Sequence, residues 1–163
     1  MTTSFQTGQG AKLKGLMDAI FQNHTDDALH QMVSLAQWDL IGPFMQPFSL
    51  AQGQILIKEG SMDRILYFIE SGSLSVHFED LGGKVNLAIL HPGSVVGEGS
   101  FFSQRPRSAS VQGVSACELW ALNPIRFAEL SSRQPSAALA LALALGAVIS
   151  RRLVNQRRRI SVT

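Results

Sequence analysis

The sequence has little cysteine, little charge and no long apolar run. Its 163 residues include one cysteine, so no disulfide can form within the chain, and its four histidines are scattered. Scattered histidines argue against a zinc site built from cysteine and histidine ligands. Residues 1–15 contain no apolar stretch like that of a secretory signal peptide. A single free thiol is typical of a reducing compartment, so we predict a cytoplasmic protein.

Apolar residues are frequent but interrupted. The longest apolar run extends from Ala137 to Ile149, which is shorter than the about 20 residues that a membrane-spanning helix needs. The sequence therefore predicts no membrane span and favours a buried or interface helix here. Apolar residues make up 45% of the chain and charged residues 16%, an ordinary composition for a globular domain.

Charge is unevenly distributed along the chain. The net charge is +2, yet residues 130–163 contain six arginines and no acid. This basic tail can be a solvated helix end. Alternatively, it can attract nucleic acid, anionic lipid or an acidic protein surface.

The N-terminal part has a helical pattern. Between residues 12 and 36 the apolar residues recur at helical spacing: Leu16, Ile20, Phe21, Leu29, Met32, Val33 and Ala36. Thr25-Asp26-Asp27 is suited to cap a second helix within this stretch, and Pro43 and Pro47 then break the pattern. We predict an N-terminal helical segment over residues 1–34.

Short apolar runs separated by glycine turns follow. We expect strands at Ile55–Ile57, Ile65–Ile69, Leu74–Phe78 and Val85–Ile89, and two more within Ala109–Leu122. Many short strands with glycine turns are typical of a sandwich, jelly roll or small barrel. Strand alternation predicts that His77 faces water, and Trp120 is expected in the core.

Helices return after Asn123-Pro124. One short helix is expected over residues 125–130, and Pro135 is suited to open a long one that continues to about Arg157. Leucine and alanine alternate in its first half, but alanine is the best helix former and a poor strand former, so we predict a helix. A helix this apolar needs contacts on more than one side.

The segment between residues 96 and 110 carries the chemistry. A single-turn helix from Gly99 to Ser103 would point free N–H groups at one spot, which suits a phosphate. Arg107 could reach the same spot with a bidentate guanidinium, and Glu98 could accept hydrogen bonds from sugar hydroxyls. From the residues alone, an ion pair between Glu98 and Arg107 within a plain loop is an equally good interpretation.

The same segment resembles the phosphate-binding cassette of the cyclic nucleotide-binding domain. That family includes the catabolite activator protein and the regulatory subunits of protein kinase A. The resemblance lies in Gly97-Glu98 and Pro106-Arg107-Ser108-Ala109-Ser110, with His91-Pro92-Gly93 and Ile57-Lys58-Glu59-Gly60 upstream. It covers residues 35–130, which we predict as the nucleotide-binding domain, followed by a C-terminal helix with a basic tail over 131–163.

The resemblance implies a fold and a set of ligand contacts. The fold is a mainly β structure, a jelly-roll-like β-roll with N-terminal helices and a long C-terminal helix. Glu98 would bind the ribose 2′-hydroxyl and Arg107 a phosphate oxygen. The implied ligand-binding set is Gly97, Glu98, Gly99, Ser100, Arg107, Ser108 and Ala109. Gly99-Ser100 departs from the family, whose members usually have Leu-Ala or Leu-Gly there, so the cassette lacks an apolar anchor.

The predicted function is that of a cyclic nucleotide sensor, with cAMP or cGMP as ligand and no catalysis of its own. The sequence shows no catalytic constellation, and we expect neither metal nor cofactor. We expect the C-terminal helix to transmit the signal and to mediate a homodimer or cover the bound base. The alternative function is a DNA-binding transcription regulator of the catabolite activator type, whose helix-turn-helix is not visible in this sequence.

Overall fold

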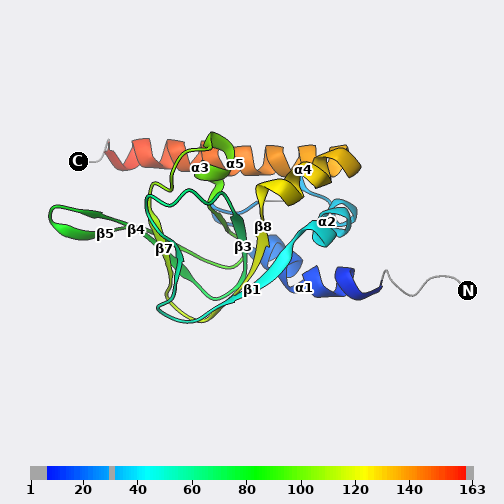
Figure 1. The fold of residues 1–163 in the computed structure, drawn as a ribbon, viewed down its shortest axis with the longest axis horizontal. Helices are drawn as coiled ribbons and strands as arrows, with labels where there is room; N and C mark the ends of the chain where they lie inside the picture. The colour runs from blue at the N-terminus through cyan, green and yellow to red at the C-terminus, as the bar shows by residue number, and fades with distance from the viewer. Residues whose placement is uncertain (1–6, 30–31, 161–163) are drawn as a thin grey trace, which may run out of the picture.

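The computed structural model of the chain describes residues 7–29 and 32–160, and two four-stranded antiparallel sheets form its centre (Figure 1). One sheet has the order β1 (Gln46–Leu50), β8 (Cys117–Leu122), β3 (Leu66–Ser71) and β6 (Val95–Val96). The other has the order β2 (Ile55–Ile57), β7 (Ser110–Gly113), β4 (Leu74–Asp80) and β5 (Gly83–Leu90). The predicted mainly β roll with flanking helices is confirmed.

Two short edge strands were not predicted. β1 contains Pro47, which has no N–H to donate, and the strand lies at the edge of its sheet beside β8. Proline is tolerated at such an edge because the outer side of the strand has no ladder to complete. β6 has two residues and pairs only with β3.

The predicted exposure of His77 is wrong. Its side chain is 7% exposed. The pairing of β4 with β5 shifts its register between Val76 and His77, as at a β-bulge. A bulge breaks the alternation of inward and outward side chains on which the prediction depended. Trp120, by contrast, is buried as expected.

The N-terminal helices differ from the prediction. α1 (Thr7–Gln22) packs Leu16 and Ile20 into the core. Residues 23–29 then form turns and an isolated bridge rather than a helix. The second helix is α2 (Leu35–Ile41), which Ser34 caps in a capping box with Gln37. Leu29 and Val33 are buried in the core although they lie outside an α-helix, so their spacing does not reflect helical structure. Residues 30–31 lie outside the described part.

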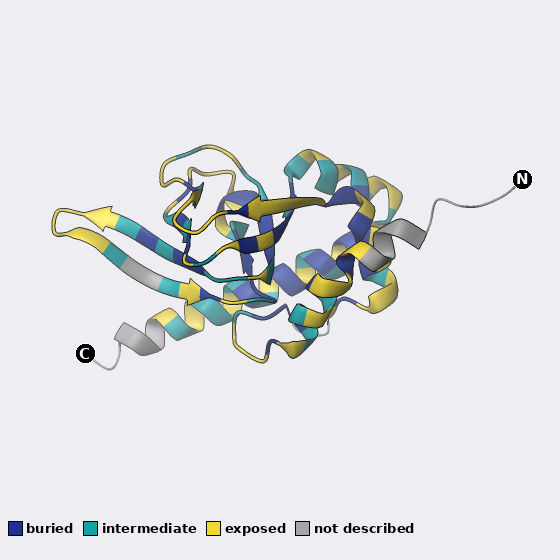
Figure 2. Cartoon of the chain, turned by 90° about the horizontal axis from the view of Figure 1, so that it is seen from below, coloured by how far each residue is buried: buried dark blue, intermediate teal, exposed yellow. Residues whose placement is uncertain are grey.

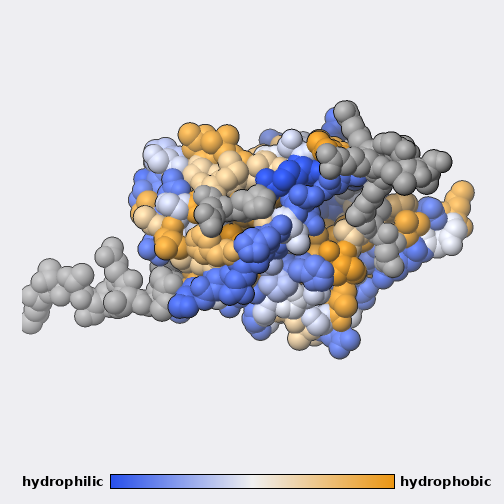
Figure 3. All heavy atoms as spheres, turned by 180° about the vertical axis from the view of Figure 1, so that it is seen from behind, coloured by the Kyte–Doolittle hydropathy of each residue, from blue (hydrophilic) through white to orange (hydrophobic). Residues whose placement is uncertain are grey.

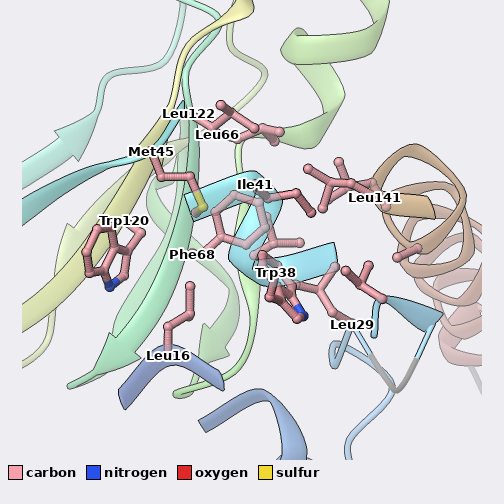
Figure 4. Packing of buried hydrophobic residues seen from close by; sticks show 14 of the residues in the cluster. Leu16, Leu29, Trp38, Ile41, Met45, Leu66, Phe68, Trp120, Leu122 and Leu141 are labelled. Atoms are coloured by element: carbon pink, nitrogen blue, oxygen red, sulfur yellow. The ribbon is translucent and has the colours of Figure 1, made fainter. Parts of the chain in front are cut away.

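A short 3-10 helix, η2 (Gly42–Phe44), leads from α2 into β1. After β8, α4 (Pro124–Arg133) begins with an Asn123 cap, and α5 (Pro135–Ile160) runs along the roll (Figure 1). Leu141 of α5, Trp38 of α2 and Phe68 of β3 point into one cluster (Figure 4). The Trp38 and Phe68 rings meet edge to face with centroids 6.0 Å apart. The long C-terminal helix is thus part of the core.

Part of α5 is apolar on its outer side as well. By length and composition, Pro135–Gln156 could cross a membrane, but the core helix of a soluble protein passes the same test. Buried and exposed residues alternate along the helix (Figure 2), and the surface seen from behind shows apolar patches separated by polar side chains (Figure 3). The packing of α5 in the core accounts for the apolar residues on its inner side.

The proposed domain divisions after residues 34 and 130 stay predictions.

Candidate functional site

A cavity of about 310 Å³ lies between the β-roll, the loop before β7 and the C-terminal part of α5. Its floor is apolar and includes Ile57, Val76, Ala88, Leu90, Val96 and Val111. The seven predicted ligand-binding residues all line it: Gly97, Glu98, Gly99, Ser100, Arg107, Ser108 and Ala109. We call residues 97–109 the cassette. A pocket with an apolar floor and converging polar groups is the usual form of a small-molecule site.

The cassette begins with a tight turn into a short helix, α3 (Glu98–Ser103). Gly97 has φ of 94°, and a Cβ there would lie 2.6 Å from the Ile65 carbonyl oxygen. A larger residue would therefore be strained and would clash. With Gly97 as its N-cap, α3 begins at Glu98, one position before the predicted start.

Arg107 is buried and its guanidinium is almost fully bonded. Nη1 donates to the Gly97 carbonyl at 3.0 Å and Nη2 to the Ile65 carbonyl at 2.7 Å. Nη2 also pairs with Asp63, to which Nε donates at 3.4 Å. Of the five N–H groups of arginine, these bonds leave one, on Nη1, without a partner among the described residues. A bidentate contact from Arg107 to a phosphate, as the sequence suggested, would require breaking one of these bonds.

Asp63 neutralises the charge of Arg107. Partial burial acts to raise the pKa of Asp63, but hydrogen bonds from Arg107 and Ser61 outweigh it and lower the pKa below its ordinary value of 3.8. The carboxylate is therefore ionised near neutral pH, and its contacts hold the Arg107 guanidinium in place.

Glu98 pairs with α5 and not with Arg107. Its Oε1 accepts a hydrogen bond from Nη1 of Arg152. The same guanidinium donates to Asp27 at 2.6 Å and to the Val95 carbonyl at 2.9 Å. Burial acts to lower the pKa of Arg152, but the two carboxylates raise it overall. The interpretation of Glu98 and Arg107 as a local ion pair is thus wrong, because each residue pairs with a residue distant in the sequence.

The C-terminal part of α5 is tied to the loop after α1. Arg151 donates from Nε to the Asp26 carbonyl at 2.9 Å and from Nη2 to the Ala28 carbonyl. Asn155 donates to the Asp26 carboxylate at 2.8 Å. Asn155 and Gln156 also line the cavity. Two of the α5 side chains that line the cavity, Arg152 and Asn155, are therefore held by Asp26 and Asp27.

Sequence reasoning missed Asp63, Asp27 and Arg152. Asp63 follows the Gly60 turn and gave no signal of its own. Arg152 was noted only as one member of the basic tail. The side chains of Arg157, Arg158 and Arg159 lie outside the described part.

The other candidate sites in the described part of the chain offer no group suited to binding or catalysis. Among the described residues, no group of three His, Cys, Asp or Glu side chains could hold a metal ion. Cys117 is buried, and burial raises the pKa of its thiol. A second, more open hollow of about 440 Å³ lies between the end of α1 and Pro92. Asp18, on its lining, pairs with the exposed Lys14 of the same helix.

Comparisons with known proteins agree on one family. The family model for the cyclic nucleotide-binding domain matches residues 47–134. The cyclic AMP receptor protein of Thermus thermophilus is 34% identical over 116 residues, which make up 71% of this chain and 52% of that protein. A cAMP-dependent protein kinase regulatory subunit of Eremothecium gossypii is 28% identical over 116 residues, 71% of this chain and 24% of that protein. The chain thus spans about half the length, or less, of these relatives.

Among solved structures, a cyclic nucleotide-binding domain from Methylobacillus flagellatus has a TM-score of 0.80 at 19% identity. The match covers 94% of this chain and 84% of that one. At this identity the likeness shows the fold alone.

Proposed function

The chain belongs to the cyclic nucleotide-binding domain family, and from this premise we propose that it is a sensor of cAMP or cGMP that signals through α5. The observation that carries the proposal is the bond between Glu98 and Arg152. It joins Glu98, the carboxylate that we expect to bind the ribose, to the helix whose C-terminal part lines the cavity. Occupation of the cavity would therefore act directly on α5.

The cavity offers a complementary group for each part of the ligand. Glu98 keeps its Oε2 without a partner among the described residues, so this oxygen can accept the ribose 2′-hydroxyl. The remaining N–H of Arg107 and the backbone N–H groups of Gly99, Ser100 and Ala109 would bind the cyclic phosphate. The Ser108 hydroxyl would reach the phosphate or a guanine edge. The apolar floor would lie under the sugar and base.

Signalling would be a shift between two positions of α5. A ligand that binds better when Arg152, Asn155 and Gln156 cover the cavity stabilises that position. The clamp to residues 26–28 would carry the change to the loop after α1. No chemical step is involved, so the proposal includes neither catalysis nor a cofactor.

A homodimer through α5 is part of the proposal. Leu139 and Leu143 are 61% and 57% exposed, and Leu153 continues their strip at 57%. With Gly146 and Ser150, these positions follow the four-three spacing of a heptad seam. A Cβ at Gly146 would meet open space, so a second helix could approach closely there. A second copy of the chain offers the same strip.

The proposal also includes a cytoplasmic location and a downstream partner, protein or nucleic acid, for the basic tail. The alternative is a transcription regulator of the catabolite activator type, for which the similarity to the Thermus receptor protein is the supporting observation. That function needs a DNA-binding element. Both described helices after β8 pack in the core, through Leu130 of α4 and Leu141 of α5.

Calorimetric titration with cAMP, cGMP and cyclic di-GMP tests the ligand. We expect a cyclic mononucleotide to bind, and binding to weaken in Arg107→Lys but not in the control Arg105→Gln. Arg105 is an exposed residue two positions earlier. Failure of both mononucleotides to bind the wild-type chain would overturn the proposal.

Light scattering after gel filtration tests the dimer. We expect wild-type protein to be dimeric and Leu143→Glu to be monomeric. Ile125→Glu, at an exposed apolar position on α4, serves as the control and should remain dimeric. A monomeric wild-type chain would contradict the dimer without affecting the ligand assignment.

A further inference from the structure

The loop between β2 and β3, residues 58–65, contacts both ends of the cassette. The Gly60 N–H donates to the Arg107 carbonyl at 2.8 Å, and the Arg107 N–H donates to the Ser61 carbonyl at 2.9 Å. Asp63 of the same loop holds the Arg107 guanidinium. The next residue, Arg64, extends to α3, at the opposite end of the cassette.

Arg64 caps the C-terminal end of α3. Its Nη2 donates to the Phe101 carbonyl at 2.8 Å and its Nε to the Ser100 carbonyl at 3.3 Å. The Arg105 N–H, which could extend the helix to the Phe101 carbonyl, donates instead to the Ser103 hydroxyl at 3.3 Å. A guanidinium at the end of a helix satisfies its last carbonyls and suits the negative end of the helix dipole.

α3 needs such support because its own stability is low. It has 6 residues and contains Gly99, and both shortness and glycine disfavour a helix. A Cβ at Gly99 would meet open space, so no side chain anchors the helix at that position. Its buried anchor is Phe101, whose ring packs against that of Phe127 with centroids 5.2 Å apart.

We infer that Arg64 is a positioning residue that fixes the direction of α3 and thereby the direction in which Glu98 presents its carboxylate to the ligand. Phe101 fixes one point of the helix in the core, and the two carbonyl bonds of Arg64 restrain its rotation about that point. Glu98, at the first position of α3, moves with any such rotation. The inference depends on the proposed function only for what Glu98 binds.

The ribose hydroxyl provides a test that a general loss of stability would not mimic. Affinities for cAMP and 2′-deoxy-cAMP are measured for wild type, Arg64→Gln, Arg64→Lys and Arg105→Gln. A hydrogen bond to a carboxylate is worth about one to two decades in affinity. We expect Arg64→Gln to reduce the preference for cAMP over the deoxy analogue about fivefold. Arg64→Lys, which keeps the charge and one donor, should recover part of this preference, and Arg105→Gln should retain it fully.

Hydrogen exchange of the ligand-free protein separates this inference from the proposed function. We expect the amides of residues 101–104, which form the hydrogen bonds of α3, to exchange faster in Arg64→Gln than in wild type or Arg105→Gln. Unchanged exchange, or an equal loss of affinity for both nucleotides, overturns the positioning role. Absence of nucleotide binding by the wild-type chain overturns the proposed function instead, and the exchange result then still decides whether Arg64 holds α3.

Discussion

Replacing Asp63 with asparagine tests whether this carboxylate compensates the charge of Arg107 until a ligand binds. The change removes the counter-charge of Arg107 and keeps a side chain of the same shape. The amide oxygen can still accept one hydrogen bond from the guanidinium. The bonds from Arg107 to the Gly97 and Ile65 carbonyls, at 3.0 and 2.7 Å, are untouched. Arg107 should therefore stay in place with an uncompensated charge.

The size of the effect follows from the unequal burial of the pair. The Arg107 side chain is 3% exposed, whereas that of Asp63 is 40% exposed. Breaking a fully buried pair costs about 3–5 kcal/mol, but an exposed pair contributes about 0–1 kcal/mol. We expect the ligand-free Asp63→Asn protein to lose about 1–2 kcal/mol, since water screens one partner. A bound cyclic phosphate would restore a negative charge, so affinity should rise by about fivefold, or ~1 kcal/mol.

Thermal unfolding with and without cAMP, together with calorimetric titration, measures both effects. Asp63→Asn should melt at a lower temperature and show a larger stabilisation by nucleotide than wild type. Asp18→Asn is the control, because Asp18 belongs to an exposed ion pair with Lys14 at 2.8 Å. If nucleotide stabilises Asp63→Asn less than wild type, Asp63 orients Arg107 rather than neutralising it, and the charge argument fails.

Two further predictions concern the same region. The stability that the Asp63–Arg107 pair provides should be fully present above pH 3.8, the ordinary pKa of Asp63. It should be lost as the pH falls through the lowered pKa, so the melting temperatures of wild type and Asp63→Asn should converge in acid. Gly97→Ala should lose about 1–3 kcal/mol in denaturant unfolding, because φ is 94° and the Cβ would lie 2.6 Å from the Ile65 carbonyl. Gly53→Ala, with φ of 80° and no neighbour within 4 Å, should show only the smaller conformational cost.

Most elements of the fold could be predicted because local signals mark them. Glycine turns delimit β2 to β5, and Asn123-Pro124 and Pro135 open the two C-terminal helices. The failures occurred where tertiary contacts replace local propensity. β1 exists only because β8 supplies its partners. Residues 23–29 are apolar in places because they cover the core, and their spacing imitated a helix.

The site divides in the same way. The cassette residues are neighbours in sequence, so a motif could bring them together. Their charge partners are not: Asp63 is 44 residues from Arg107, and Arg152 is 54 residues from Glu98. No local pattern encodes such separations. The ion pair of Glu98 with Arg107 looked reasonable only because a sequence shows neighbours along the chain and not across the fold.

Replacing Arg152 with glutamine should separate ligand binding from the response of α5. Arg152 is the α5 side chain that bonds both Glu98 and Asp27, and the three side chains are 23%, 14% and 32% exposed. Its loss leaves two carboxylates without their shared cation, which we expect to cost about 2 kcal/mol, below the range for fully buried pairs. The control Arg151→Gln removes the same charge one residue earlier, but Arg151 bonds backbone carbonyls and not the cassette. Hydrogen exchange of residues 148–156 should therefore respond to cAMP in wild type and Arg151→Gln but much less in Arg152→Gln. An undiminished response in Arg152→Gln would show that α5 senses the nucleotide by another route, such as direct contact of Asn155 or Gln156 with the base.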